Sequence, residues 1–285
     1  MLSQRTRHIV FAVAGLLTFI ILAGVTYQSV ATALERRQFP YPGRLIDVGD
    51  HQLHLHCTGE GTPTVVLESP AAGLSTSWDW VQNDLAKTTR VCSYDRAGLG
   101  WSEAGERPYA AARVPDELHT LLERAGEQAP FILAGHELGA SFARMFASRY
   151  RETTAAIVLI DDPGGAAGSA SRRVPRMVRA WPWLARVGLL RVTRTLSRRA
   201  AGLPAESGGA ARAFLNRPDH LTRGALEVAH MGETAQAAAA ETLDPALPIV
   251  EVSANSTEPP VLLDSADRAR EVTRAIEQMV KRIRH

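Results

Sequence analysis

The chain has 285 residues, of which 45% are apolar and 22% are charged. This composition supports a packed core and argues against global disorder, and the length suits one α/β domain that carries an insertion. The formal net charge is only +2, so we expect no nucleic-acid partner.

The N-terminal region contains an uncharged apolar run over residues 9–26. At 1.5 Å per residue, about 18 residues just cross a bilayer core of roughly 30 Å. We therefore expect residues 1–8 in the cytoplasm, a transmembrane anchor over 9–26 and a linker over 27–42, with membrane lipid as a partner. A cleaved signal peptide is the alternative, because residues 31–33 resemble a cleavage site, although they lie late after the apolar run.

Basic residues on the two sides of the apolar run bear on its orientation. Arg5 and Arg7 precede it, which favours a cytoplasmic N-terminus. We therefore expect a single-pass protein of the inner (cytoplasmic) membrane, with its globular domain on the periplasmic side. Arg36 and Arg37 follow the run and weaken this asymmetry.

Apolar and β-branched runs bounded by turn residues predict the strands. These runs cover residues 44–49, 52–57, 64–68, 90–95, 131–135, 155–161, 248–253 and 260–264. Apolar residues at helical spacing predict the helices. These helices cover residues 77–87, 112–126, 138–150 and 266–283.

The alternation of strands and helices indicates a fold class. Several of the strands are apolar along their whole length, which is typical of a parallel sheet covered on both faces. Residues 163–245 interrupt this pattern with a helical or irregular stretch rich in Ala, Arg and Gly. We expect an α/β core formed by 43–162 and 246–285, with 163–245 inserted as a helical lid.

The sequence Gly135-His136-Glu137-Leu138-Gly139 lies between a predicted strand and a predicted helix. A G-x-S-x-G nucleophile elbow occupies the same place in hydrolases of this architecture. The central residue of an elbow sits in a strained turn, so small residues are needed two positions before and after it. Both glycines are present here, whereas a glutamate stands in place of the serine.

Three motifs in order resemble those of a bacterial α/β-hydrolase family, which carries VVLE-x-G-x-G before a Trp, then YDRAGxGWS, then GHSLGG. They read here as VVLESPAAGLSTSW (65–78), YDRAGLGWS (94–102) and GHELGA (135–140). The resemblance covers roughly residues 44–162 and continues more weakly to 283. It implies an α/β-hydrolase fold, with acyl transfer by a serine, a histidine, an acid and an oxyanion hole.

The chain departs from this pattern at the nucleophile and at the oxyanion loop. Glu137 occupies the nucleophile position, and its extra methylene would shift the attacking atom by more than about 1 Å relative to the aspartate that some relatives use. Pro70 and Ala72 replace the two loop glycines, and proline has no N–H to donate. The N–H of Leu138 remains as the expected oxyanion donor.

The resemblance also implies a histidine after the last strand. No histidine lies between His230 and His285, and His285 is the last residue given. His220 and His230 lie in the predicted lid, and His230 is the candidate base.

The acid that orients the histidine is expected after the seventh strand. The gap between the last two predicted strands is short and contains Glu258 as its only acid. Asp161 and Asp162, which follow the sixth strand, are possible substitutes.

Changes at three triad positions predict a function other than serine-type hydrolysis. We expect a membrane-anchored, hydrolase-like protein that acts by binding or as an accessory subunit of a membrane assembly. The alternative is an active hydrolase on ester-type substrates that uses Glu137 with a lid histidine. No cofactor or metal is expected, because the chain has no C-x-x-C pair and no cysteine/histidine cluster.

Two further features have alternative interpretations. Cys57 and Cys92 fall on strands that are antiparallel neighbours in this fold, which predicts a disulfide suited to an extracytoplasmic domain rather than two buried thiols. Residues 172–199 contain nine arginines and no acid, interleaved with Trp181 and Trp183. This segment is either a helix on an anionic membrane surface or a basic lid helix that caps the pocket.

The first predicted hairpin contains His51, His54 and His56. Metal binding there is conceivable, but polar residues on a strand surface are the commoner explanation for such a pattern.

Overall fold

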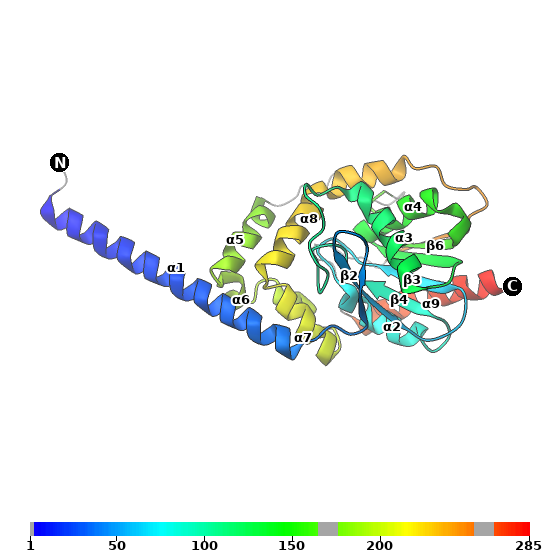
Figure 1. Ribbon diagram of the computed structural model, residues 1–285, viewed down its shortest axis with the longest axis horizontal. Coiled ribbons are helices and arrows are strands. Elements are labelled where there is room, and N and C mark those ends of the chain that lie inside the picture. The colour runs from blue at the N-terminus through cyan, green and yellow to red at the C-terminus, as the bar shows by residue number, and fades with distance from the viewer. Residues whose placement is uncertain (1–2, 165–175, 254–264) are drawn as a thin grey trace.

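The computed structural model describes residues 3–164, 176–253 and 265–285. Over these residues the strands form one seven-stranded sheet in the order β1-β2-β4-β3-β5-β6-β7. Figure 1 labels β2, β3, β4 and β6 of this sheet. The strands are β1 (Arg44–Asp47), β2 (Gln52–Thr58), β3 (Thr64–Glu68), β4 (Val91–Tyr94), β5 (Phe131–His136), β6 (Thr154–Ile160) and β7 (Ile249–Val252). β3 to β7 run parallel, and β2 is antiparallel to both β1 and β4. The predicted α/β fold with a mostly parallel sheet is confirmed.

Helices cover both faces of the sheet. The 3₁₀ turn η1 (Ser75–Trp78) and the helices α2 (Asp79–Leu85) and α9 (Ala266–Arg284) share one apolar cluster with Val65 and Leu67 of β3. The helices α3 (Val114–Ala125) and α4 (Leu138–Arg149) share another cluster with Val66. Successive side chains of a strand point to opposite faces, so a strand buried between two helical layers must be apolar at every position.

The antiparallel pairing of β2 with β4 brings the two cysteines together. Cys57 and Cys92 are partners in the ladder and form a disulfide. The predicted pairing is therefore confirmed.

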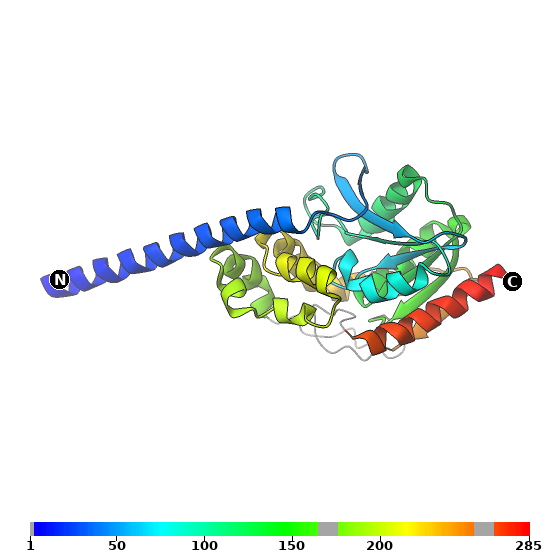
Figure 2. The same ribbon diagram turned by 90° about the horizontal axis from the view of Figure 1, so that it is seen from below.

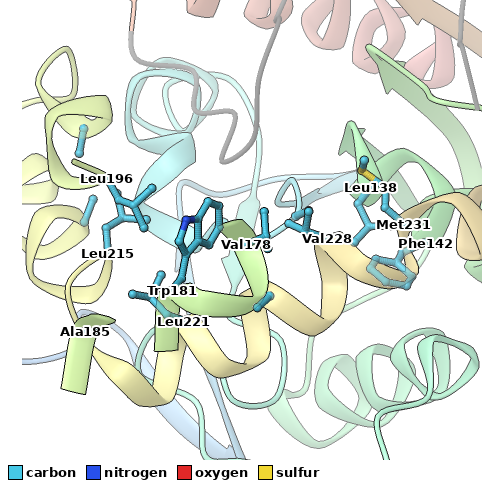
Figure 3. Packing of buried hydrophobic residues seen from close by; sticks show 14 of the residues in the cluster. Leu138, Phe142, Val178, Trp181, Ala185, Leu196, Leu215, Leu221, Val228 and Met231 are labelled. Carbon is cyan, nitrogen blue, oxygen red and sulfur yellow. The ribbon is translucent and has the colours of Figure 1, made fainter. Parts of the chain in front are cut away.

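The insertion between β6 and β7 is helical where the structure describes it. Its elements are η4 (Arg176–Ala180), α5 (Trp181–Arg186), α6 (Leu189–Thr193), η5 (Ser197–Ala200), α7 (Ala205–Phe214) and α8 (Pro218–Ala239). One buried cluster runs from Trp181 and Leu221 in this lid to Leu138 and Phe142 of α4 (Figure 3). The lid therefore packs directly on the helix that follows the elbow.

The N-terminal helix α1 (Gln4–Gln38) is longer than the predicted span. The sequence interpretation placed a linker over residues 27–42, whereas the helix continues to Gln38 and its second half lies against the lid (Figure 2). Gln28 is buried there, and its side chain donates a hydrogen bond to the carbonyl oxygen of Asn216 at 2.9 Å. These contacts explain why the helix does not end where the apolar run ends.

Short 3₁₀ turns complete the described secondary structure. They are η2 (Ala111–Arg113) before α3 and η3 (Arg151–Thr153) before β6. The other predicted strands and helices occur with ends shifted by a few residues at most. The strand predicted over 260–264 lies outside the described residues.

Candidate functional site

The turn between β5 and α4 keeps the backbone of a nucleophile elbow. Glu137 has φ 50° and ψ −114°, a conformation that L-residues other than glycine rarely adopt. A Cβ atom on Gly135 would lie 2.3 Å from the carbonyl oxygen of Gly139, and one on Gly139 would lie 2.3 Å from the carbonyl oxygen of Glu68. Both glycines are therefore required by close backbone packing, as the sequence predicted.

The carboxylate of Glu137 turns toward the loop that follows β3. Its side chain is buried, and its Oε2 accepts a hydrogen bond from the backbone N–H of Ala71 at 3.0 Å. In elbow hydrolases, an N–H of this loop and the N–H after the nucleophile together hold the oxyanion. A carboxylate oxygen of the protein itself therefore occupies one of the two expected oxyanion donors.

The neighbouring backbone amides of the same loop also donate to acceptors within the protein, or lack an N–H. Pro70 has no N–H. The N–H of Ala72 donates to Oε2 of Glu227 at 3.1 Å, and the N–H of Gly73 donates to the carbonyl oxygen of Pro70 at 2.9 Å. The loop from 70 to 73 thus has no amide that is available to a ligand oxygen without breaking an internal bond. Of the predicted oxyanion donors, the N–H of Leu138 still stands at the start of α4, where helix amides lack intrahelical acceptors.

A buried charge cluster holds this loop from behind. Arg96 donates from Nε and Nη2 to the two carboxylate oxygens of Glu227, at 2.9 and 2.8 Å. It also donates to the carbonyl oxygens of Ser69 and Pro70, at 2.7 and 2.8 Å, and to Oε2 of Glu68 at 3.3 Å. All three charged side chains are at most 2% exposed. One guanidinium therefore joins β3, its loop and the lid helix α8.

The two carboxyl groups of the cluster differ in pKa. Burial raises the pKa of Glu68 to about 7, although Arg96 and the hydroxyl of Tyr94 partly oppose that rise. Burial also acts against the charged form of Glu227, but its paired bonds with Arg96 bring its pKa below the ordinary value. Glu227 makes two short bonds to the guanidinium and Glu68 one longer bond, so Glu227 keeps the negative charge and Glu68 takes up a proton first.

Both ring nitrogens of His220 of α8 form hydrogen bonds within the site. Its Nδ1 accepts a hydrogen bond from the N–H of Gly100 at 3.1 Å, so we assign the proton to Nε2, which lies 3.1 Å from the carbonyl oxygen of Ala72. Burial lowers the pKa of His220 to about 4. A neutral ring with both nitrogens in use is not placed to act as a general base.

The structure gives no support to His230 as the base. Its side chain is 46% exposed on α8, and its Nδ1 lies 2.9 Å from a carboxylate oxygen of Glu233, one turn further along. Glu137, by contrast, is only 5% exposed. The assignment of His230 from the sequence counted histidines in the lid, and it had no means of knowing which side of the helix would face solvent.

The candidate acids have other contacts. Asp162 forms an ion pair with Arg144 at 2.8 Å. Asp161 ends β6 with φ 49°, and its Oδ2 lies 3.4 Å from Nε2 of His136. Glu258 lies outside the described residues.

The histidines of the first hairpin do not form a metal site in the described structure. The Nδ1 atom of His54 lies 2.9 Å from Asp95, and its Nε2 contacts the carbonyl oxygen of Pro42. Among the described residues, only Cys57, Cys92 and Glu127 come close enough together to hold a metal ion, and both sulfur atoms are in the disulfide. The sulfur atoms therefore cannot act as thiolate ligands.

A cleft of about 650 Å³ lies at the opposite edge of the sheet, where β3 and β5 begin. Its charged lining is internally paired, because Arg90 donates to both carboxylate oxygens of Glu127, at 3.0 and 2.8 Å. This cleft is separate from the elbow, which follows the other end of β5.

The sequence missed Glu227 and the roles of His220 and Ala71. His220 and Glu227 are seven residues apart on α8, which places them on the same side of the helix two turns apart. Two ionisable side chains at this spacing within an otherwise apolar helix face are the signal that points to them. Their target in the loop lies about 150 residues away and only folding brings it close.

Comparisons with known proteins agree with the architecture. A model described as "Alpha/beta hydrolase family" matches residues 53–285. The chain is 41% identical over 88 residues to an "AB hydrolase superfamily protein" of Gibberella zeae, covering 30% of this chain and 27% of that protein. It is 34% identical over 98 residues to "Probable transporter efuK" of Hormonema carpetanum, covering 32% of this chain and 14% of that one.

Another relative is described by its membrane. The chain is 27% identical over 129 residues to an "Uncharacterized vacuolar membrane protein" of Saccharomyces cerevisiae, covering 39% of this chain and 20% of that protein. The chain thus spans well under a third of the length of each of these three curated relatives.

Solved structures share the fold at low identity. A thermophilic esterase from Thermogutta terrifontis has a TM-score of 0.57 at 19% identity, covering 82% of this chain and 94% of that one. An enol-lactonase of Burkholderia xenovorans has a TM-score of 0.58 at 16% identity, covering 84% of this chain and all of that one. At these identities the likeness describes the fold alone.

Proposed function

Because the chain belongs to the alpha/beta hydrolase family, we propose that it keeps this fold as a membrane-anchored binding protein or accessory subunit of a membrane assembly, without serine-type hydrolysis. One observation carries the proposal: the carboxylate of Glu137 occupies the N–H of Ala71, where a hydrolase would hold the oxyanion. The same residue that replaces the nucleophile thus also fills the site that would stabilise the transition state.

The loss of catalytic power is large on energetic grounds. Removal of a single oxyanion donor typically costs about 10²–10³ in kcat. Here the donor is not merely removed, because a carboxylate lies where negative charge would have to develop. His220, which bonds to the loop, offers no free base, since both of its ring nitrogens are bonded. These deficits act on separate steps of acyl transfer.

The structure of α1 supports a retained membrane anchor. Ile9, Phe11 and Phe19 are 63, 68 and 69% exposed, an apolar surface that a bilayer would cover. Beyond this span, the side chain of Arg191 in the lid donates to Gln28 at 3.0 Å and pairs with Glu35. Signal cleavage after residue 33 would separate Gln28 from the lid and break this buried contact.

Charge and redox chemistry support a proposal for the side of the membrane on which the globular domain lies. Arg5 and Arg7 at the start of α1 favour a cytoplasmic N-terminus. The disulfide between Cys57 and Cys92 is typical of an oxidising compartment. We therefore place the globular domain on the periplasmic side of the inner membrane.

Turnover of p-nitrophenyl esters by the full chain tests the proposal. We expect a rate equal to the uncatalysed background for both the wild type and Glu137→Gln. Turnover by the wild type that is lost in Glu137→Gln would overturn the proposal and support an active enzyme.

The alternative, an active hydrolase that uses Glu137, has one observation in its favour. Glu137 retains the strained φ of 50°, which costs of the order of 1–3 kcal/mol and is often kept where it serves chemistry. A single turnover in ¹⁸O-labelled water, followed by mass analysis of the peptide that contains Glu137, tests this mechanism. Incorporation of label into that carboxylate would show a covalent intermediate on Glu137 that water had hydrolysed.

Affinity purification from native membranes separates the two forms of the binding proposal. A stoichiometric protein partner would support an accessory subunit. A monomer that retains a small molecule would support a receptor.

A further inference from the structure

The lid has an apolar outer surface in addition to its buried inner one. Trp181, Ala185 and Leu190 point into the core cluster that the lid shares with α8 (Figure 3 labels the first two). Trp183 and Val192, on the same two short helices, are 69 and 70% exposed. A soluble lid that already buries one apolar face has no folding reason to present a second.

We define the lid corner as residues 183–192, which comprise the end of α5, the turn formed by Val187 and Gly188, and most of α6. It lies directly against α1 (Figures 1 and 2). A Cβ atom on Gly24 would lie 2.3 Å from the carbonyl oxygen of Val187, and one on Gly188 would lie 3.2 Å from the carbonyl oxygen of Gly24. The two backbones therefore touch, in the manner that small residues allow between membrane-embedded segments.

This contact fixes the depth of the lid corner. Gly24 belongs to the apolar run of residues 9–26, and Gln28 one turn later is the first buried polar residue of α1. About 18 residues of helix span about 27 Å, so the run just fills the bilayer core and Gly24 lies near one of its surfaces. Whatever touches Gly24 lies at the same level.

We propose that the lid corner inserts into this bilayer surface as a second membrane-embedded element, with Trp183, Leu189 and Val192 at the boundary between the acyl chains and the headgroups. The inference rests on the proposed membrane anchoring of α1. Trp183 carries the guanidinium of Arg186 over its ring at 4.8 Å, an aromatic and cationic pairing suited to the headgroup region.

The charge around the lid corner favours anionic lipid as the occupant. Arg186, Arg194 and Arg198 are exposed, and residues 172–199 contain no acid. Glu35 of α1 is already paired with Arg191. Exposed arginines beside apolar side chains are the composition of a helix that lies in an anionic interface. The lid would then be held between the bilayer and the sheet.

Nitroxide labels on the full chain in phosphatidylcholine and phosphatidylglycerol vesicles test the depth of each position. The variants are Trp183→Cys and Val192→Cys, with Phe19→Cys as the bilayer reference and Lys281→Cys on α9 as the water reference. Both native cysteines are in the disulfide, so the new thiol is the labelled one. The four positions are exposed on the protein, so the substitutions leave the core intact.

Accessibility of each label to oxygen and to a water-soluble nickel chelate gives the result. We expect the nickel accessibility of Trp183→Cys and Val192→Cys to be several-fold below that of Lys281→Cys and above that of Phe19→Cys, which lies about 8 Å deeper than Gly24. A nickel accessibility equal to that of Lys281→Cys, with Phe19→Cys still in lipid, would overturn the inference alone. Low accessibility to both reagents would show a protein partner on the corner and would also overturn it. A water-exposed Phe19→Cys would overturn the anchoring itself, and the inference with it.

Discussion

Two turns meet at the carboxyl ends of neighbouring strands, and they keep the geometry of a hydrolase site to different degrees. The elbow after β5 keeps its backbone, with Glu137 at φ 50° between two tightly packed glycines. The loop after β3 has lost its donors, because Pro70 has no N–H and the amides of Ala71 and Ala72 are bonded to the carboxylates of Glu137 and Glu227.

The difference follows from what each turn supports. The elbow connects a central strand to a core helix with atoms in contact, so any change in its backbone would disturb the fold. The donors of the loop are needed only when a reaction takes place, and carboxylates from the elbow and the lid can satisfy them permanently. Retention of the elbow is therefore an indication of fold, whereas the state of the loop amides is an indication of activity.

The largest expected effect is a loss of unfolding free energy in Arg96→Leu, which tests the loop after β3. This change leaves the buried Glu227 and Glu68 without their shared cation, which typically costs about 3–5 kcal/mol. Denaturant unfolding of the full chain in detergent measures the loss. Arg113→Leu is the matched control, because Arg113 pairs with the exposed Glu106 and such surface pairs are worth about 0–1 kcal/mol. Equal losses in the two variants would contradict the assigned role of Arg96.

The next largest effect is a loss of stability in Gly135→Ala, which tests the elbow after β5. The added Cβ would lie 2.3 Å from a backbone oxygen of α4, so we expect a loss near 3 kcal/mol, at the upper end of overpacking costs. Gly126→Ala has φ +76° with nothing within 4 Å of the new Cβ, and should lose only about 1 kcal/mol through backbone strain. A smaller loss in Gly135→Ala than in Gly126→Ala would show that the elbow tolerates bulk.

The next prediction concerns how stability depends on pH through Glu68, which lies beside the loop after β3. Burial raises the pKa of Glu68 to about 7 from its ordinary value of 4.5, so the folded state binds more protons than the unfolded state between these pH values. Its stabilising contribution is complete below about pH 4.5 and is lost as the pH rises through about 7, by about 3 kcal/mol. Unfolding free energies of the wild type and Glu68→Gln across this range should diverge with that sign.

His220 acts with the opposite sign in an overlapping window. Its pKa is lowered to about 4 from 6.5, so its contribution is complete above about pH 6.5 and is lost as the pH falls through 4. The wild type and Glu68→Gln both contain His220, so the difference between their unfolding free energies cancels the contribution of His220. A difference between them that stays constant with pH would contradict the raised pKa of Glu68.

The sheet was predictable because its strands are buried on both faces and read as continuous apolar runs. The two cysteines followed from the strand order. The loop bonds were not predictable, because Glu227 reaches Ala72 from about 150 residues away, and the exposed position of His230 depends on how α8 rotates against the core. The extension of α1 was not predicted because Gln28 and Glu35 are polar residues that follow the apolar run, as residues of a linker would be. In the structure both side chains bond to the lid.

The most direct test of the central claim is labelling of Glu137→Ser by a fluorophosphonate, with the full chain in vesicles. A serine restored to an intact elbow would react if the remaining machinery were present. We predict no label although the substitution frees the N–H of Ala71, because neither lid histidine can serve as the base: both ring nitrogens of His220 are bonded and His230 is exposed to solvent. Stoichiometric labelling at position 137 of this variant would show that a working base survives beside the elbow, and would contradict the account.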